Sequence, residues 1–174
     1  MKKKWIIFLG ILFVITLFVL IFFKTGIRTK DISTNDFFMS YDTTWKLKKE
    51  KNGILLKHKK TKSKIEIQSM VLEDNYMDIP LKDIIQDIVY GIEKQNDSYV
   101  LINTLESPTT SYESYSYLYE DDMDQALVNI YKKDNKVIVA YFSAESEVFD
   151  ILLDSVDNIF DSIEIKTGEE IKLT

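Results

Sequence analysis

The chain has 174 residues but no cysteine, one histidine, two prolines and only five glycines. Without cysteine it can form no disulfide, no thiolate zinc site and no cysteine nucleophile. The lone His58 removes the usual histidine-based metal sites and catalytic triads. The sequence also lacks a Walker loop, a dinucleotide glycine pattern, HExxH and G-x-S-x-G. These absences predict a protein without catalysis that uses no metal and no cofactor.

Charge is missing from one long segment near the start of the chain. Residues 5–23, WIIFLGILFVITLFVLIFF, would span roughly 28 Å as a helix, close to the hydrocarbon core of a bilayer. The chain has no alanine before Ala126, which excludes an A-x-A cleavage site near this run, and a lipid-attached leader would need a cysteine. We therefore predict a retained transmembrane helix with the lipid bilayer as its partner. A buried core helix is a poor alternative because the run has no polar face.

Positive charges flank both ends of this run. Four precede it, counting the amino terminus, and three follow it. Because positive flanks stay in the cytoplasm and long domains translocate largely regardless of charge, the excess favours a cytoplasmic N-terminus and an extracytoplasmic C-terminal domain. The predicted location is the cell membrane, crossed once. The opposite topology is the alternative.

The net charge of −6 conceals an uneven distribution. Residues 31–72 carry nine lysines and five acids, whereas residues 73–174 carry seven lysines and twenty-three acids. So acidic a body argues against nucleic acid as a partner, because nucleic-acid binding relies on a cationic surface. The many Lys, Ile, Asn and Asp residues, with three alanines and one arginine, are typical of an AT-rich bacterial genome.

Hydrophobic periodicity divides the rest of the chain into strands and two helices. Residues 37–72 and 98–144 contain strand-like runs, and VIVAYF at 137–142 is apolar on both faces, which predicts a central strand. Asn52-Gly53 predicts a tight hairpin with positive φ at both residues. Residues 78–96 and 146–163 repeat apolar residues at helical spacing. The predicted fold class is α+β: an N-terminal transmembrane helix, then an antiparallel sheet sandwiched by two amphipathic helices.

The predicted domain boundaries follow this order. Residues 1–30 are the cytoplasmic tail, the anchor and its flank, and residues 31–35 are a connector. Residues 36–166 form the α+β domain, and residues 167–174 are a C-terminal tail.

The element order resembles a known family. The opening FFMSYDTTWKL, the helix after the first meander, the antiparallel run and the closing VFDILLDSVDNIFDSIEI together resemble the PsbP-like family of α-β-α sandwich domains. The Tyr-Pro-x-x-Trp-like entry of that family stands here as Tyr41-Asp42-Thr43-Thr44-Trp45, without the proline. The family includes extrinsic photosystem subunits and many exported bacterial proteins without assigned activity. The resemblance therefore implies a non-catalytic binding or assembly module.

Two groups of residues are candidate ligand-binding sites. Nine lysines fall within nineteen residues, and the candidates among them are Lys57, Lys59, Lys60, Lys62 and Lys64. Their field favours contact with lipid headgroups or an anionic wall polymer. The alternative is an edge strand that lysines protect against unwanted pairing. Tyr115, Tyr117 and Tyr119 alternate and so share one face, which either packs under a helix or displays an aromatic surface to a ligand.

Acidic residues supply the remaining candidates. The run at 120–124 could hold a hard cation, but it lacks the spacing of an EF-hand loop, and a solvated turn is the alternative. An acidic stripe on the last helix is typical of a solvent-facing surface, and it comprises Asp150, Asp154, Asp157 and Asp161.

Three functions are compatible with the sequence. The leading prediction is a membrane-anchored, extracytoplasmic accessory module without catalysis and with a protein partner. A surface hydrolase or metal-dependent enzyme using Asp122 and Asp124 is one alternative. A module that binds polyanions through the lysines is the other.

Overall fold

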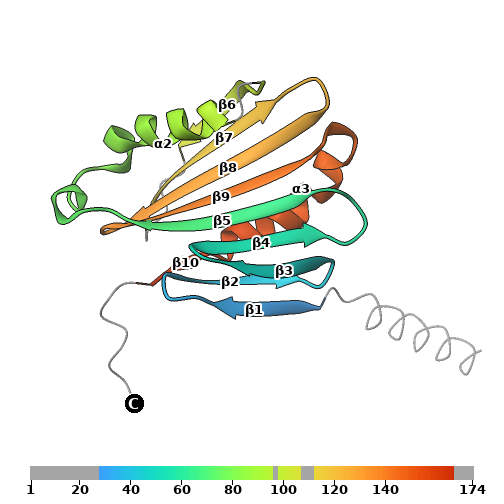
Figure 1. The fold of residues 1–174 in the computed structure, drawn as a ribbon, viewed down its shortest axis with the longest axis horizontal. Helices are drawn as coiled ribbons and strands as arrows, with labels where there is room; N and C mark the ends of the chain where they lie inside the picture. The colour runs from blue at the N-terminus through green and yellow to red at the C-terminus, as the bar shows by residue number, and fades with distance from the viewer. Residues whose placement is uncertain (1–27, 96–97, 107–111, 167–174) are drawn as a thin grey trace, which may run out of the picture.

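The computed structural model describes residues 28–95, 98–106 and 112–166 (Figure 1). The predicted anchor at residues 5–23 and the predicted tail at residues 167–174 lie outside these ranges. No helix within them is both long and apolar enough to cross a membrane. The fold is α+β, as predicted, with antiparallel sheets and two helices.

The strands form two antiparallel sheets rather than the single predicted one. The small sheet has β2 (Phe37–Asp42) between β1 (Thr29–Ser33) and β10 (Glu164–Ile165). The large sheet has the order β3-β4-β5-β9-β8-β7-β6. Its strands are β3 (Trp45–Glu50), β4 (Gly53–His58), β5 (Lys64–Val71), β6 (Val100–Glu106), β7 (Glu113–Glu120), β8 (Asp124–Lys133) and β9 (Lys136–Glu145).

Two helices cover opposite faces of the large sheet. α3 (Ser146–Asp161) follows β9 directly and packs against β2, β8 and β9. α2 (Leu81–Gln95) follows the short 3-10 helix η1 (Asp74–Tyr76) and lies over β7, β8 and β9 (Figure 1). Both helices bury one apolar stripe, which is the physical reason for the helical spacing in the sequence.

The faces of the large sheet are assigned by its central strand. In β9, Ala140 and Phe142 belong to the core that includes α3, whereas Val137 and Tyr141 face the core beneath α2. The predicted central position of VIVAYF is confirmed, because β9 pairs with β5 on one side and β8 on the other.

The N-terminal boundary of the fold differs from the prediction. Residues 29–33, interpreted as flank and connector, form β1, which pairs with β2 along its whole length. Only Ile32 of this strand is buried. A strand that buries one side chain shows no alternation of apolar and polar residues, so periodicity could not reveal it.

The first hairpin of the large sheet also differs from the prediction. Glu50 pairs with Gly53, so Lys51 and Asn52 form the turn and Gly53 is the first residue of β4. Among the described residues, Asp134 in the β8–β9 turn has a positive φ of 55°, and neither Asn52 nor Gly53 has one. Glycine is required at 53 for a different reason: a Cβ there would collide with the carbonyl oxygen of Ile67 on β5.

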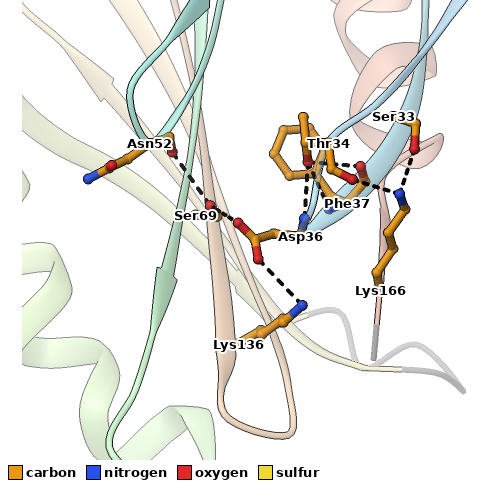
Figure 2. A network of polar contacts seen from close by, with 8 residues as sticks. All are labelled: Ser33, Thr34, Asp36, Phe37, Asn52, Ser69, Lys136 and Lys166. Carbon is orange, nitrogen blue, oxygen red and sulfur yellow. Dashed lines mark hydrogen bonds and ion pairs between the residues drawn. The ribbon is translucent and has the colours of Figure 1, made fainter. Parts of the chain in front are cut away.

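Asp36 joins the small sheet to the large one (Figure 2). Its carboxylate accepts a 2.7 Å hydrogen bond from the Ser69 hydroxyl of β5 and forms a 3.4 Å ion pair with Lys136 of β9. Close by, the Lys166 ammonium donates to the Ser33 hydroxyl at 2.5 Å and to the Thr34 carbonyl at 2.6 Å. The Asp36 contacts hold the small sheet against the large one, whereas the Lys166 contacts tie β10 to β1 within the small sheet.

Candidate functional site

Three lysines on adjacent strands form a row across one end of the large sheet. Lys46 of β3 is directly opposite Lys57 of β4, and Lys57 is directly opposite Lys64 of β5. Directly opposed residues of an antiparallel pair point to the same face, with Cβ atoms about 5 Å apart. We call this row, Lys46, Lys57 and Lys64, the lysine ladder.

The lysine ladder lies on the α2 side of the sheet but beyond α2 itself. Lys64 lines a groove beside α2, which fixes the face, and the register carries Lys57 and Lys46 onto the same face. The core beneath α2 contains no described residue of β3 or β4. Figure 1 shows the same arrangement, with β3 and β4 away from α2. This part of the sheet therefore presents an open, cationic face.

The ladder is only partly neutralised by neighbouring carboxylates. Lys64 forms a 2.8 Å ion pair with Glu66, two residues along β5. Within the described ranges, neither Lys46 nor Lys57 has a carboxylate within ion-pair distance, and both are exposed. Directly opposed like charges destabilise a sheet. The row therefore carries an electrostatic cost that packing does not explain.

The other predicted lysines lie in the turn between β4 and β5. Lys59 donates a 2.5 Å hydrogen bond to the Thr43 carbonyl, and Lys60 is exposed. Lys62 forms a 3.0 Å ion pair with Glu145, and this hydrogen-bonded partner raises the pKa of the Lys62 ammonium. Of the predicted lysines, Lys57 and Lys64 thus belong to the ladder, and the other three lie in the turn. The third member of the ladder is Lys46.

His58 is the last residue of β4 and is half-buried. Its ring lies 5.1 Å from that of Trp45, and its Nδ1 is 2.9 Å from the Thr61 hydroxyl. Burial lowers its pKa, and Lys60 adds to this effect, whereas the Asp42 carboxylate opposes it. His58 is therefore mainly neutral at neutral pH.

The three predicted tyrosines share the face beneath α2. Tyr117 and Tyr119 are buried in that core, with rings stacked 6.3 Å apart, and Tyr115 packs at its margin. Burial raises the pKa of Tyr119, and the nearby Glu93 carboxylate raises it further. The Tyr119 hydroxyl has no partner of normal hydrogen-bond geometry among the described residues. Tyr117 and Tyr119 therefore pack under a helix, the first of the two predicted alternatives. A role of these tyrosines in ligand binding stays a prediction.

A groove separates the second half of α2 from β5 and β9. We call it the α2 groove; it has a volume of about 520 Å³. Its apolar lining includes Met70, Ile88, Ile92 and Tyr141, and Lys64 and Glu66 lie on the sheet side. The groove could not be predicted from the sequence, because the apolar stripe of α2 continues at helical spacing along its whole length.

The acidic run between β7 and β8 folds as a turn. Asp121 accepts backbone hydrogen bonds from Met123 at 2.9 Å and Asp124 at 2.7 Å, and these bonds lower the pKa of its carboxyl. The described ranges contain no group of three His, Cys, Asp or Glu side chains that could hold a metal ion. Nothing in this geometry assigns a catalytic role to Asp122 or Asp124.

The acidic stripe on α3 is exposed, on the side of the molecule opposite the lysine ladder. Asp157 has a raised pKa because of partial burial and the neighbouring carboxylates of Asp161 and Asp154. The acidic stripe and the lysine ladder therefore lie on opposite sides of the large sheet.

Comparison with known proteins rests on structure, since no family model and no curated protein sequence matches the chain. Cyanobacterial PsbP from Synechocystis superposes with a TM-score of 0.65 and 12% identity, covering 82% of this chain and 95% of that one. LpqN, a protein involved in cell envelope biogenesis of Mycobacterium tuberculosis, gives 0.55 and 11%, covering 83% and 94%. A Pseudomonas aeruginosa protein of unknown function gives 0.55 and 8%, covering 81% and 99%. The chain therefore has a PsbP-like fold, as its element order predicted.

Proposed function

We propose that this chain is a non-catalytic module anchored in a bacterial cell membrane by residues 5–23, whose extracytoplasmic domain binds polyanions through the lysine ladder. The observation that carries the proposal is the ladder itself. Lys46, Lys57 and Lys64 are directly opposed on a face that no described helix covers. Phosphate groups of a ligand would neutralise the row and remove its electrostatic cost.

The distribution of charge supports one orientation of the domain on a polyanion. The acidic stripe on α3 lies on the opposite side of the sheet from the ladder. An anionic surface attracts the ladder and repels α3, so the long-range field turns the ladder toward it. The net negative charge of the whole chain is thus compatible with anion binding on one face.

The predicted anchor supports the proposed location. Five residues, 24–28, separate Phe23 from Thr29 in the sequence. Even a fully extended segment of this length spans only about 18 Å. If residues 5–23 span the bilayer, the domain is held beside the membrane surface. The structural similarity to LpqN, an envelope-biogenesis protein, agrees with an envelope location.

Charge reversal in the full-length chain tests the proposal. The chain is placed in nanodiscs of phosphatidylcholine and mixed with phosphatidylglycerol vesicles in one arm and soluble poly(glycerol phosphate) in the other. The triple variant Lys46→Glu, Lys57→Glu, Lys64→Glu should lose the binding that the unmodified chain shows to the vesicles or to the polymer. The arm in which this loss occurs identifies the ligand as a lipid headgroup or a wall polymer. A control with the same change in net charge reverses Lys49, Lys51 and Lys60, which are outside the ladder, and should retain most of the binding. Equal loss in both variants, or no loss in either, contradicts the proposal.

A second experiment tests the orientation in the membrane. Met123 is three-quarters exposed in a turn, and the chain has no native cysteine, so Met123→Cys introduces a single reactive thiol. An extracytoplasmic domain is labelled by a membrane-impermeant thiol reagent in intact cells. Labelling that requires lysis places the domain inside and overturns the proposed location.

A protein partner is the second candidate, and the edge strand β6 favours it. Val100, Leu101 and Ile102 are all exposed on this strand, and no described strand pairs with its outer edge. The opposite edge strand, β3, carries Lys46, Lys48 and Lys49, the residue type that blocks unwanted strand pairing. The occupant that fits β6 is an extended strand of a partner protein. A photo-crosslinking residue at Leu101 should recover one specific partner, whereas the same residue at Lys49 should not; random neighbours at both positions count against it.

A further inference from the structure

We propose that the α2 groove binds the hydrocarbon chain of an anionic amphiphile whose headgroup is held by the lysine ladder. The inference rests on the proposed function and names its ligand class: a lipid with one acyl chain accessible and a phosphate-bearing headgroup. The groove and the ladder form one continuous surface, because Lys64 belongs to both.

The two halves of α2 pack differently, which creates the groove. In the first half, Leu81, Ile84 and Ile85 are 0%, 8% and 4% exposed. In the second half, Ile88 and Ile92 continue the same stripe but are only half-buried. The apolar face of this half thus packs on the core but stays partly exposed on the side of the groove. Hydrophobic side chains in that position favour an apolar occupant.

Gly91 keeps the groove open. It lines the groove in the interior of α2, and a Cβ built at this position would meet no atom within 4 Å. Glycine weakens a helix interior, and no close contact requires it here. The missing side chain instead leaves room between Ile88, Ile92 and the sheet. The groove volume of about 520 Å³ lies within the range of pockets that enclose small ligands.

The charges around the groove fix the direction of the ligand. Asp87 lies on the helix side and carries no ion pair among the described residues, so it repels an anionic headgroup there. Glu66 is neutralised by Lys64, whose ammonium is 6.0 Å from the centre of the Tyr141 ring. The headgroup is therefore directed toward Lys57 and Lys46, while the chain lies between α2 and Tyr141.

Photo-crosslinking on the unmodified full-length chain tests this arrangement. The chain is reconstituted in phosphatidylcholine nanodiscs that contain lysophosphatidylglycerol with a diazirine on its acyl chain, and the crosslinked residues are mapped by mass spectrometry. The proposal predicts crosslinks at Met70, Ile88 and Ile92. It also predicts much weaker labelling by lysophosphatidylcholine with the same diazirine, since that headgroup has no net negative charge.

Two variants of α2 provide the matched comparison. Gly91→Leu fills the groove and should lower crosslinking by about tenfold, the effect expected when roughly two methylene groups lose their contacts. Tyr90→Leu changes an exposed neighbour on the same helix and should leave labelling unchanged. Circular dichroism checks that both variants retain the helix.

The outcomes separate this inference from the proposed function. If the groove residues are not labelled in the unmodified chain, or both lipids label them equally, the inference is wrong. Binding of poly(glycerol phosphate) that still depends on the ladder would leave the proposed function intact. Loss of ladder dependence with both probes would instead overturn the proposed function.

Discussion

The hydroxyl of Ser155 in α3 donates a 2.5 Å hydrogen bond to the carboxylate of Asp42 at the end of β2, 113 residues away in the sequence. The same hydroxyl accepts a 3.1 Å hydrogen bond from the Trp45 indole N–H of β3. Asp42 also accepts hydrogen bonds from the backbone N–H and the hydroxyl of Thr44. This cluster ties α3 to the point where the chain passes from the small sheet to the large one.

Removing the Ser155 hydroxyl should destabilise the domain. Ser155→Ala leaves the buried Asp42 with one fewer donor and the Trp45 N–H without its acceptor. Because a hydrogen bond to a charged group contributes about 1.5–3 kcal/mol, we expect the free energy of unfolding to fall by about that amount. Denaturant titration of the full-length chain measures it. Asn158→Ala on the exposed side of α3 is the control, and an equal loss in both variants would contradict a specific role for the cluster.

Asp42 should make stability depend on pH in the acid range. Burial acts to raise the pKa of its carboxyl, but hydrogen bonds from Ser155 and Thr44 outweigh burial and hold the pKa below its usual value. Its contribution is therefore present above the unfolded-state pKa and is lost as the pH falls through the lower folded-state pKa. The free energy of unfolding should decline below about pH 4. In Asp42→Asn the decline should be shallower; an unchanged pH profile would contradict this assignment.

His58 should report on the charge of Asp42. Its pKa is lowered chiefly by burial, and the Asp42 carboxylate opposes that shift by stabilising the imidazolium. Asp42→Asn should therefore lower the pKa of His58 further, while Lys60→Gln should raise it. A titration followed by NMR resolves this group without interference, because it is the single histidine of the chain. A rise in Asp42→Asn would show that the two side chains are not coupled as described.

Two glycines should respond in opposite ways to alanine. At Gly53 a Cβ collides with the backbone oxygen of Ile67, so Gly53→Ala should cost about 3 kcal/mol of stability or more. At Gly91 the Cβ meets open space inside a helix, so Gly91→Ala should stabilise the domain by roughly 0.5–1 kcal/mol. Thermal unfolding of the pair provides the measurement. Similar effects of the two changes would be inconsistent with the packing at either site.

Neutralising the middle of the lysine ladder should stabilise the fold while it weakens binding. Lys57 is opposed by Lys46 on one side and Lys64 on the other, so Lys57→Gln should raise the free energy of unfolding by roughly 0.2–1 kcal/mol at low salt. The gain should disappear at high salt, where the repulsion is screened. Lys60→Gln, in the turn, is the control. A loss of stability in Lys57→Gln would assign the ladder a structural rather than a binding role.

The fold followed from periodicity where an element buries a full stripe or alternates cleanly. α2 and α3 were predicted because their apolar residues recur at helical spacing, and β9 because a short run that is apolar on both faces is typical of a central strand. β1 was missed because Ile32 is its single buried side chain. The division into two sheets was also missed, since it depends on tertiary contacts at Asp36 and Asp42 that local pattern does not encode.

The candidate site was predicted only in part, for a related reason. The sequence identified a lysine-rich hairpin pair, but strand register decides which lysines meet, and it selects Lys46, Lys57 and Lys64 over the turn residues Lys59 and Lys60. The α2 groove arises from the spacing between a helix and a sheet, which amphipathic pattern alone cannot give.

Binding of polyanions by the lysine ladder can be measured through its salt dependence, with poly(glycerol phosphate) and the full-length chain in phosphatidylcholine nanodiscs. Each lysine that contacts a phosphate contributes about one to the slope of log affinity against log salt concentration. We expect that changing Lys46, Lys57 and Lys64 together to Gln lowers the magnitude of this slope by about two to three, because Glu66 already pairs with Lys64. The triple control, with Lys49, Lys51 and Lys60 changed to Gln, should show little change in slope. An unchanged slope in the ladder variant, or the same decrease in the control, would show that the lysine ladder does not bind the polyanion.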